Sequence, residues 1–283
     1  MTVIAERAKT YASFIKVEHT LFSIPLVFAG LVLYTHGWPS GGLCFLIIVA
    51  AMSGRVMAMG LNRIIDAQID AQNPRTRKRE LPRGAMRRKE AWTIVLIASL
   101  VYFVSASAIA PICLWLSPLP VFLFLVYPSL KRWTVWSHAG LGLTWSMAPL
   151  GGWLAGSKSL SGLHEVFWLW LFCVLWVTGF DIIYATMDEA FDRTAGLHSL
   201  PARFGKHPAL RVAVAVHLLA FLSLTMLWYE QLYSPVAFMW LAAIGALFVW
   251  QHAIAERRPA FAFFQLNGIL GFLVLGFVIT GMR

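Results

Sequence analysis

The stretch NRIIDAQIDAQNPRTRKRELPRG, residues 62–84, marks an abrupt change from apolar to charged residues and indicates the fold of the chain. It follows directly on an apolar segment, residues 42–61. It then brings two aspartates, Asp66 and Asp70, and a cluster of arginines and lysines. An apolar run of about 20 residues is long enough to cross a bilayer as a helix. The stretch is therefore expected to mark the point where a membrane helix meets the aqueous phase.

The composition of the whole chain favours a helical membrane protein. Of its 283 residues, 59% are hydrophobic and 13% are charged, and the mean hydropathy is +0.70. Soluble domains carry about 25% charged residues. The alternation typical of transmembrane barrels does not occur, so an all-α integral membrane fold is expected. Nine candidate transmembrane helices follow: 20–37, 42–61, 91–110, 112–130, 136–156, 164–187, 210–229, 233–253 and 260–282.

Lysine and arginine gather on one side of these spans. All but three of the 23 basic residues lie in segments that nine spans place on the same face. The exceptions are Arg55, within a span, and Lys158 and Arg283, on the other face. Because basic loops stay in the cytoplasm, the N-terminus is predicted to be cytoplasmic and the C-terminus to lie on the far side. Basic residues divided among membrane loops argue against nucleic-acid binding.

The organisation along the chain indicates one domain. No long polar linker interrupts the spans, so residues 1–283 are expected to form a single transmembrane domain. Two longer cytoplasmic connections, about 67–90 and 189–209, each follow a helix end that carries aspartates. The first apolar run lacks a small-residue cleavage site and is expected to be a retained anchor helix. The cysteines lie singly in apolar runs and indicate neither a disulfide nor a metal site: Cys44, Cys113 and Cys173.

Five of the 13 acidic residues in the chain are aspartates that lie in two short windows. One set is spaced i, i+4, i+8: Asn62, Asp66 and Asp70. The other is spaced i, i+3, i+7, i+11: Asp181, Tyr184, Asp188 and Asp192. At about 100° per residue, each set is predicted to form a stripe on one helix face.

Two acidic stripes at one membrane face would repel each other unless a cation neutralised them. Mg²⁺ fits, because it binds carboxylate oxygens and keeps open positions for substrate phosphates. The nearby arginines and lysines would then bind phosphate oxygens. This combination predicts a diphosphate site, and a lipid tail on the diphosphate explains its place in a membrane protein. The alternative is solvated acids paired with Arg63 or Arg193, which explains two stripes in so acid-poor a chain less well.

Further basic and polar residues are candidates for the same site. Arg55 lies inside a span, seven residues before Asn62 and so on the same helix face. A charge inside the membrane is costly and marks a functional site, although a structural ion pair is the alternative. YPSLKRWT places Tyr127 four residues before Lys131, with Arg132 next; for Arg132, anchoring of the helix end is the alternative.

Lys16, in the segment IKVEHT before the first span, has the same alternative. Its neighbours Glu18 and His19 are assigned no chemistry.

Together these residues resemble the UbiA superfamily of intramembrane prenyltransferases. NRIIDAQID matches the family motif Asn-x-x-x-Asp-x-x-x-Asp, although Arg63 stands where many members have Asp. RTRKRELPRG resembles its Arg-x-Leu-Pro-x-Gly continuation, which makes Arg79 a motif-matched candidate. YPSLKR and DIIYATMDEAFDRTAGLHSLPARFG resemble its later elements. KVEHTLFSIP, NPRT and GLHSLPARFG are most similar to the 4-hydroxybenzoate polyprenyltransferase-like group, and within it to the futalosine-route menaquinone branch. The last three spans carry no usable motif.

The resemblance implies nine helices around a central cavity with a lateral opening, and cytoplasmic cap loops after helices 2 and 6. It implies that Mg²⁺ is held by Asn62, Asp66, Asp70, Asp181, Asp188 and Asp192. The substrate-binding residues would be Lys16, Arg55, Asn62, Arg79, Tyr127, Lys131, Arg132 and Tyr184. Arg55, Lys131 and Arg132 would stabilise the departing diphosphate, and Asp66 or Asp181 would deprotonate the acceptor.

The function expected from this resemblance is Mg²⁺-dependent transfer of a polyprenyl group from its diphosphate to a hydroxyaryl carboxylate. The acceptor would be 4-hydroxybenzoate or a dihydroxynaphthoate, in ubiquinone or menaquinone synthesis at a bacterial-type cytoplasmic membrane. Lys16 or Arg55 is the candidate partner of the acceptor carboxylate. Two alternatives remain at this point: a cation- or proton-coupled transporter that uses the aspartates, and a lipid-binding scaffold. No obligate protein partner is indicated.

Overall fold

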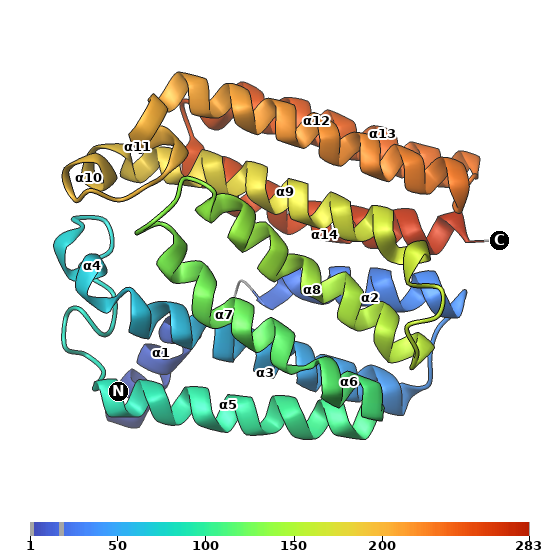
Figure 1. Ribbon diagram of the computed structural model, residues 1–283, viewed down its shortest axis with the longest axis horizontal. Coiled ribbons are helices and arrows are strands. Elements are labelled where there is room, and N and C mark those ends of the chain that lie inside the picture. Colours follow the sequence, from blue (N-terminus) through green and yellow to red (C-terminus); the bar gives the residue numbers. More distant parts are fainter. Residues whose placement is uncertain (1–2, 17–19, 283) are drawn as a thin grey trace.

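The chain folds into a bundle of long, roughly aligned helices whose connections gather at the two ends of the bundle (Figure 1). The computed structural model describes residues 3–16 and 20–282, and within them it contains helices and turns but no strand. Glu18, His19 and Arg283 lie outside the described residues.

The helices up to the middle of the chain are α1 (Val3–Ile15), α2 (Thr20–Thr35), α3 (Gly41–Ile65), α4 (Ala67–Gln72), α5 (Arg88–Ile109), α6 (Pro111–Leu116), α7 (Pro118–Leu130) and α8 (Ser137–Ser157). Those that follow are η2 (Leu163–Val166), α9 (Phe167–Ala185), η3 (Thr186–Asp188), α10 (Glu189–Thr194), α11 (Leu200–Phe204), α12 (Lys206–Glu230), α13 (Pro235–Ala255) and α14 (Pro259–Gly281), of which η2 and η3 are 3₁₀ helices.

Seven helical segments among the described residues are long and apolar enough to cross a membrane. They are Gly41–Ile65, Arg88–Ile109, Pro111–Leu130, Leu163–Thr194, Lys206–Glu230, Pro235–Ala255 and Pro259–Gly281. Two predicted spans are not among them: α2, whose apolar part Ser23–Thr35 is shorter, and α8. The chain is thus a multi-pass membrane protein, and the count of nine spans stays a prediction.

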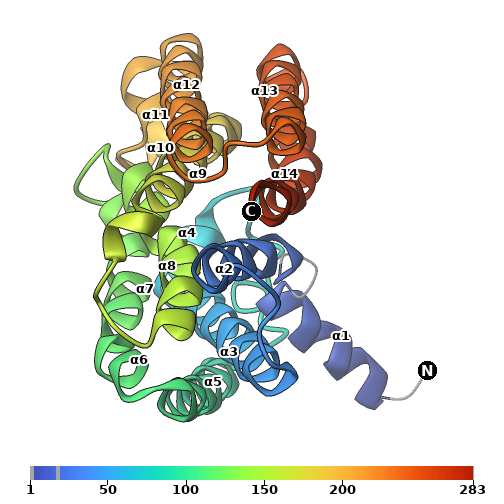
Figure 2. The ribbon, with the colours of Figure 1, turned by 90° about the vertical axis from the view of Figure 1, so that its right-hand side faces the viewer.

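Helix α8 packs against its neighbours through small residues. It lies between α2 and α9 (Figure 2). A Cβ atom on Gly152 would overlap the carbonyl oxygen of Val27 in α2, and one on Gly142 would overlap that of Val174 in α9. Glycine therefore permits the close backbone approach that holds these three helices together. The large side chains Trp153 of α8 and Trp176 of α9 are fully buried in the same core.

The predicted span 112–130 consists of two helices. Pro111 and Pro118 each stand in the first turn of a helix, α6 and α7 respectively. Proline has no backbone N–H to donate, which suits the first turn of a helix and interrupts the interior of one. The single apolar run in the sequence is consequently divided at Ser117.

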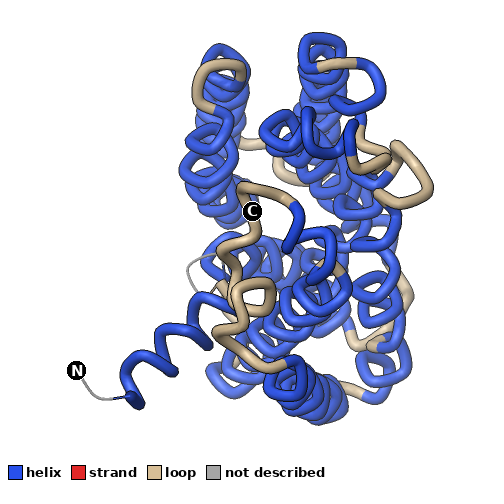
Figure 3. The backbone as a smooth tube through the Cα atoms, turned by 90° about the vertical axis from the view of Figure 1, so that its left-hand side faces the viewer, coloured by secondary structure: helices blue, strands red, loops and turns tan. Residues whose placement is uncertain are grey.

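Both long connections lie at one end of the bundle, on the left in Figure 1 and facing the viewer in Figure 3. The first, between α3 and α5, contains α4 and a series of turns. The second, between α9 and α12, contains η3, α10 and α11. Their position at a common end brings the two aspartate motifs together, while their role as caps over a site stays a prediction.

Candidate active site

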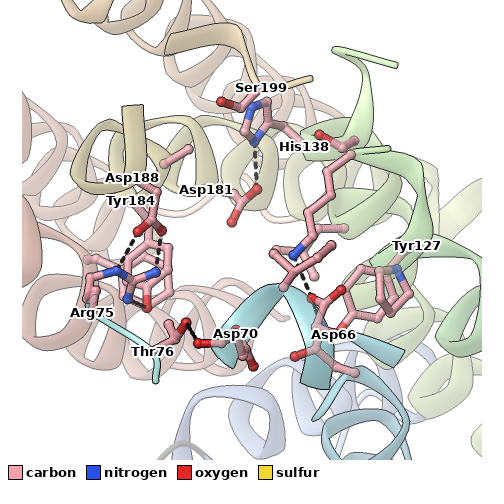
Figure 4. A pocket seen from close by; sticks show the side chains of 18 of the residues that line it. Asp66, Asp70, Arg75, Thr76, Tyr127, His138, Asp181, Tyr184, Asp188 and Ser199 are labelled. Atoms are coloured by element: carbon pink, nitrogen blue, oxygen red, sulfur yellow. Dashed lines mark hydrogen bonds and ion pairs between the residues drawn. The ribbon is translucent and has the colours of Figure 1, made fainter. Parts of the chain in front are cut away.

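A cavity of about 300 Å³ lies at this end of the bundle (Figure 4). All the predicted site residues except Arg132 line it: Lys16, Arg55, Asn62, Asp66, Asp70, Arg79, Tyr127, Lys131, Asp181, Tyr184, Asp188 and Asp192. Asp66 and Asp70 lie on one side of it, and Asp181 and Asp188 lie opposite. The two aspartate motifs, far apart in the sequence, therefore face one cavity.

The first motif lies at a bend between two helices. Helix α3 ends at Ile65, Asp66 is its C-cap, and α4 begins at Ala67. Two helical hydrogen bonds bridge the bend: the Asp66 amide donates to the Asn62 carbonyl at 2.9 Å, and the Asp70 amide to the Asp66 carbonyl at 2.8 Å. The i, i+4, i+8 spacing thus keeps its shared face, although the helix is not continuous.

The second motif is distributed over three short elements instead of the single predicted helix. Asp181 and Tyr184 belong to α9, Asp188 ends η3, and Asp192 belongs to α10. A 3₁₀ segment has three residues per turn instead of 3.6, so it turns the chain at the end of α9. The predicted continuous stripe was wrong in this respect, yet its four side chains still line the cavity.

In the first motif, basic side chains pair with both carboxylates. The Lys131 ammonium lies 2.6 Å from Asp66 Oδ2. The Arg79 guanidinium donates to both oxygens of Asp70, at 2.8 and 2.6 Å. Charge-assisted pairs of this kind compensate the burial of Asp66 and Asp70, which are 3% and 4% exposed.

In the second motif, the first connection reaches across to Asp188. Asn73 Nδ2 and Arg75 Nε donate to Asp188 Oδ1, at 2.9 and 2.8 Å. Arg75 also donates to Asp188 Oδ2 and to the Tyr184 hydroxyl. Its guanidinium carbon lies 4.7 Å from the centre of the Tyr184 ring. Arg75 is therefore the main link between the two long connections.

The remaining aspartates of this motif pair with uncharged or titratable partners. Asp181 Oδ2 lies 2.7 Å from Nδ1 of His138, at the start of α8. Asp192 Oδ2 accepts a hydrogen bond from the Ser199 hydroxyl at 2.9 Å. Every aspartate of the two motifs thus already has a protein partner.

Burial and pairing shift the pKa of two groups beyond the ends of the spans. Burial raises the pKa of the Asp66 carboxyl, and the Lys131 ammonium opposes this shift. Burial alone would lower the pKa of Arg75. Its hydrogen bonds to Asp188 and Tyr184 outweigh burial, so the pKa of Arg75 lies above its ordinary value. Arg75 is consequently a permanent cation at the mouth of the site.

The residues predicted to bind Mg²⁺ supply only oxygen donors, which suits a hard divalent cation. Among the described residues, however, no three His, Cys, Asp or Glu side chains stand close enough together to hold an ion. Arg75 and Arg79 engage two of the carboxylates instead. The buried Oδ1 of Asp66 accepts no hydrogen bond from the described part of the chain. The donor chemistry fits a divalent cation, which these carboxylates would bind either beside their arginines or in exchange for them.

Arg132 does not line the cavity, and its role in binding substrate stays a prediction. Its guanidinium donates to the Ile65 carbonyl at 2.8 Å and lies 3.7 Å from Asp66 Oδ1. A cation at the C-terminus of a helix satisfies a terminal carbonyl and interacts favourably with the helix dipole. Arg132 therefore holds the end of α3 in this structure, next to Asp66.

Arg63, where the resemblance is weakest, has a structural partner. It is 5% exposed, and its guanidinium lies 3.8 Å from Glu80 in the first connection. Glu80 also accepts a hydrogen bond from Ser13 of α1 at 2.6 Å. Arg63 thus helps to hold the first connection against α3 and α1.

Several residues that line the cavity were missed by the sequence reasoning. They are Asn73, Arg75, Thr76, His138, Trp145, Trp176, Ser199, Phe263 and Asn267. Arg75 lies in NPRT, which served only for the family resemblance, so the motif itself was a usable signal. Phe263 and Asn267 come from α14, a span without a motif, and no sequence signal could have found them.

A second, largely apolar cavity of about 420 Å³ adjoins the first. Helices α2, α3, α5, α7 and α8 contribute most of its lining, and Leu160 and Leu163 extend it to the opposite end of the bundle. The residues shared by the two cavities are Arg55, Met59, Tyr127, Leu141 and Trp145. At this junction the Arg55 guanidinium carbon lies 5.0 Å from the centre of the Trp145 ring. The cavity that contains the aspartates therefore borders a largely apolar one, and the two share part of their walls.

The fold and the cavities are those expected of an enzyme embedded in a membrane. The profile of the UbiA prenyltransferase family matches residues 23–269. The chain belongs to this family and is a prenyltransferase. This membership sets aside the transporter and the scaffold.

Known proteins resemble the chain over nearly its whole length. It is 29% identical to the 4-hydroxybenzoate octaprenyltransferase of Vibrio campbellii, over 98% of this chain and 99% of that protein. The apo structure of a UbiA homologue from Aeropyrum pernix K1 is 32% identical, with a TM-score of 0.82 over 94% of this chain and 98% of that one. A UbiA homologue from Archaeoglobus fulgidus, solved with GPP and Mg²⁺, has a TM-score of 0.72 at 17% identity, over 96% and 99% of the two chains, and shares the fold.

Proposed function

We propose that this enzyme transfers a polyprenyl group from its diphosphate to a hydroxyaryl carboxylate, in the synthesis of a respiratory quinone. The observation that carries the proposal is the junction of the two cavities. One contains carboxylates and cations suited to a diphosphate, and the other is an apolar chamber suited to an isoprenoid tail. The Vibrio relative, a 4-hydroxybenzoate octaprenyltransferase, supports the choice of substrates.

The diphosphate binds in the polar cavity, where Lys131, Arg75, Arg79 and Lys16 supply positive charge. When the allylic C–O bond breaks, its electron pair leaves with the diphosphate, and these cations stabilise the negative charge that develops there. A bound divalent cation, held by Asn62 and by Asp66, Asp70, Asp188 and Asp192, would share that charge. The Archaeoglobus homologue solved with GPP and Mg²⁺ supports this part of the proposal.

The acceptor binds at the junction of the cavities. Arg55 is placed to bind its carboxylate, because the guanidinium lies over Trp145 and faces both chambers. The aromatic ring attacks the allylic carbon to form a C–C bond, and the ring carbon then loses its proton. Asp181 is the better candidate for accepting it, because Lys131 and Arg132 already engage Asp66.

The location of the enzyme follows from its charge distribution. We place the N-terminus and the polar cavity in the cytoplasm of a bacterial-type inner membrane, with residues 1–283 forming one domain. The basic connections lie at the end that holds the polar cavity, as the positive-inside rule requires of a cytoplasmic face. The lipid bilayer supplies the donor, and we expect no obligate protein partner.

Arg55→Gln is expected to raise the KM for the acceptor acid by about 10- to 100-fold. A hydrogen bond to a charged group contributes about 1.5–3 kcal/mol, and tenfold corresponds to about 1.4 kcal/mol. The KM for the donor should change much less. Initial rates measured against both substrates test this, with Arg83→Gln, an exposed arginine in the first connection, as the matched control. Equal increases in both KM values would contradict the assignment of Arg55 to the acceptor.

Ala106→Trp is expected to restrict the enzyme to short prenyl donors. Ala106 is 5% exposed and lines the apolar cavity. An indole there fills space that a long tail would need, and a well-packed interior does not yield readily to extra volume. Geranyl and polyprenyl diphosphates should be compared by kcat/KM, with Val104→Trp, at a 57% exposed position on the same helix, as the control. Unchanged use of the long donor would place its tail elsewhere.

A further inference from the structure

His138 is a buried imidazole that joins Asp181 to the second connection. It belongs to α8 and is 3% exposed. One ring nitrogen, Nδ1, lies 2.7 Å from Asp181 Oδ2. The other, Nε2, accepts a hydrogen bond from the backbone amide of Leu200, the first residue of α11, at 3.2 Å. Figure 4 shows the imidazole directed at Asp181 beside Ser199. Both nitrogens are thus engaged, one by the site and one by the connection.

These two contacts fix the tautomer of His138. Because the Leu200 amide can only donate, Nε2 must present its lone pair, and the ring proton must lie on Nδ1. Nδ1–H then donates to Asp181. The bond at Nε2 thus determines that Nδ1 carries the proton. Because Nδ1–H is held in place, it fixes the orientation of the carboxylate that accepts from it.

The consequence for Asp181 is geometric. Its Oδ2 is occupied by His138, and its side chain remains partly exposed to the cavity, at 21% of its surface. With Oδ2 held by His138, the other oxygen, Oδ1, faces the open part of the cavity in Figure 4. Lys131 plays a different part, since it pairs with Asp66 on the other wall.

We propose that His138 is a positioning residue that sets the orientation of Asp181 for the transfer reaction. Because the same imidazole binds the Leu200 amide, the orientation of Asp181 also depends on how the second connection packs against α8. In this proposal it acts through Asp181 and not on either substrate directly. The inference rests on the proposed function, in which Asp181 accepts the ring proton. The connection has other anchors near Leu200: the His198 amide donates to the Lys131 carbonyl at 2.6 Å, and the Ser137 hydroxyl donates to the His198 carbonyl at 3.4 Å.

Three substitutions separate the two contacts of the imidazole. The amide nitrogen of Asn occupies roughly the position of Nδ1, so His138→Asn keeps a donor for Asp181 and loses the Leu200 contact. The amide oxygen of Gln can occupy roughly the position of Nε2, so His138→Gln keeps an acceptor for Leu200. His138→Leu removes both. His207→Gln, at an exposed position at the start of α12, is the matched control and should behave as the wild type.

Two measurements are made on each detergent-solubilised full-length variant. The first is kcat and KM for prenyl transfer from a polyprenyl diphosphate to 4-hydroxybenzoate, or to a dihydroxynaphthoate if the wild type prefers it. The second is hydrogen–deuterium exchange of peptides covering residues 197–204. His138→Leu is expected to lower kcat by about 10- to 100-fold with little change in either KM, and to speed exchange. His138→Asn should keep a higher kcat than His138→Leu, while its residues 197–204 exchange as fast as in His138→Leu. His138→Gln should show slower exchange of residues 197–204 than either of these variants.

A double-mutant cycle with Asp181→Asn distinguishes positioning from general stabilisation. Once Asp181→Asn has lowered kcat, His138→Leu is expected to lower it little further, because the two residues act together. An equally large loss with and without Asp181 would overturn the inference and leave the proposed function intact. So would wild-type kcat in His138→Leu. An Asp181→Asn enzyme with wild-type kcat would instead refute the role given to Asp181 under the proposed function, and the inference with it.

Discussion

Asp188→Ala is expected to lower kcat/KM for prenyl transfer by about 10²- to 10³-fold, the usual cost of removing one preorganised electrostatic group from a catalytic site. The carboxylate lies on the cavity wall opposite the first motif and is the meeting point of Asn73 and Arg75. Its loss removes a proposed ligand of the divalent cation. It also leaves the Arg75 guanidinium without its main partner. Initial rates with a polyprenyl diphosphate and an aromatic acid measure the effect.

The neighbouring Glu189→Gln provides the matched control. Glu189 pairs with Arg193 within α10 and does not line the cavity, so its loss should leave turnover unchanged. Asp188→Asn tests charge alone, because the amide oxygen can still accept from Arg75 or Asn73. If Asp188→Ala and Glu189→Gln were equally active, Asp188 would have no part in catalysis.

Removal of divalent metal is expected to lower the rate by at least about 100-fold, since a metal supplies several kcal/mol of charge stabilisation to a leaving group of this kind. Without a cation, the negatively charged diphosphate would lie beside five carboxylates and be repelled by them. Arginine or lysine partners neutralise only some of these carboxylates. EDTA should stop the reaction and excess Mg²⁺ should restore it. EDTA already saturated with Mg²⁺ is the control, and full activity in metal-free EDTA would refute the proposed metal dependence.

The same experiment has a readout besides turnover. We expect Arg75 and Arg79 to exchange Asp188 and Asp70 for phosphate oxygens when a cation binds these carboxylates. Donor and Mg²⁺ together should therefore alter hydrogen exchange in residues 73–79 more than either does alone. Changes that are merely additive would indicate that the arginines do not exchange partners.

Much of the fold was visible in the sequence because hydropathy and charge report it directly. The ends of the long helices fall near the predicted boundaries, as with α12 to α14 for the predicted spans 210–229, 233–253 and 260–282. The division of 112–130 at Ser117 was missed. The run is apolar throughout, and only Pro118, which begins the next helix, indicates the break. Helix α8 was predicted as an ordinary span, whereas its glycines serve close packing.

The site was predictable where spacing carries the information. The i, i+4, i+8 pattern places Asn62, Asp66 and Asp70 on one cavity wall even though the helix bends at Asp66. Contacts between distant segments were not predictable. The contact between Arg75 and Asp188 depends on how the two connections pack against each other. The sequence around His138 does not indicate that its partner is Asp181.

The central claim is tested most directly by mass spectrometry of the products made by the purified wild-type enzyme. It would be supplied with Mg²⁺, a polyprenyl diphosphate, and 4-hydroxybenzoate or a dihydroxynaphthoate in parallel. The account predicts diphosphate release and a product whose mass equals the acceptor plus the polyprenyl group less one hydrogen, with at least one of these acids. Unchanged acceptors with every acid, or release of the free polyprenyl alcohol alone, would contradict it.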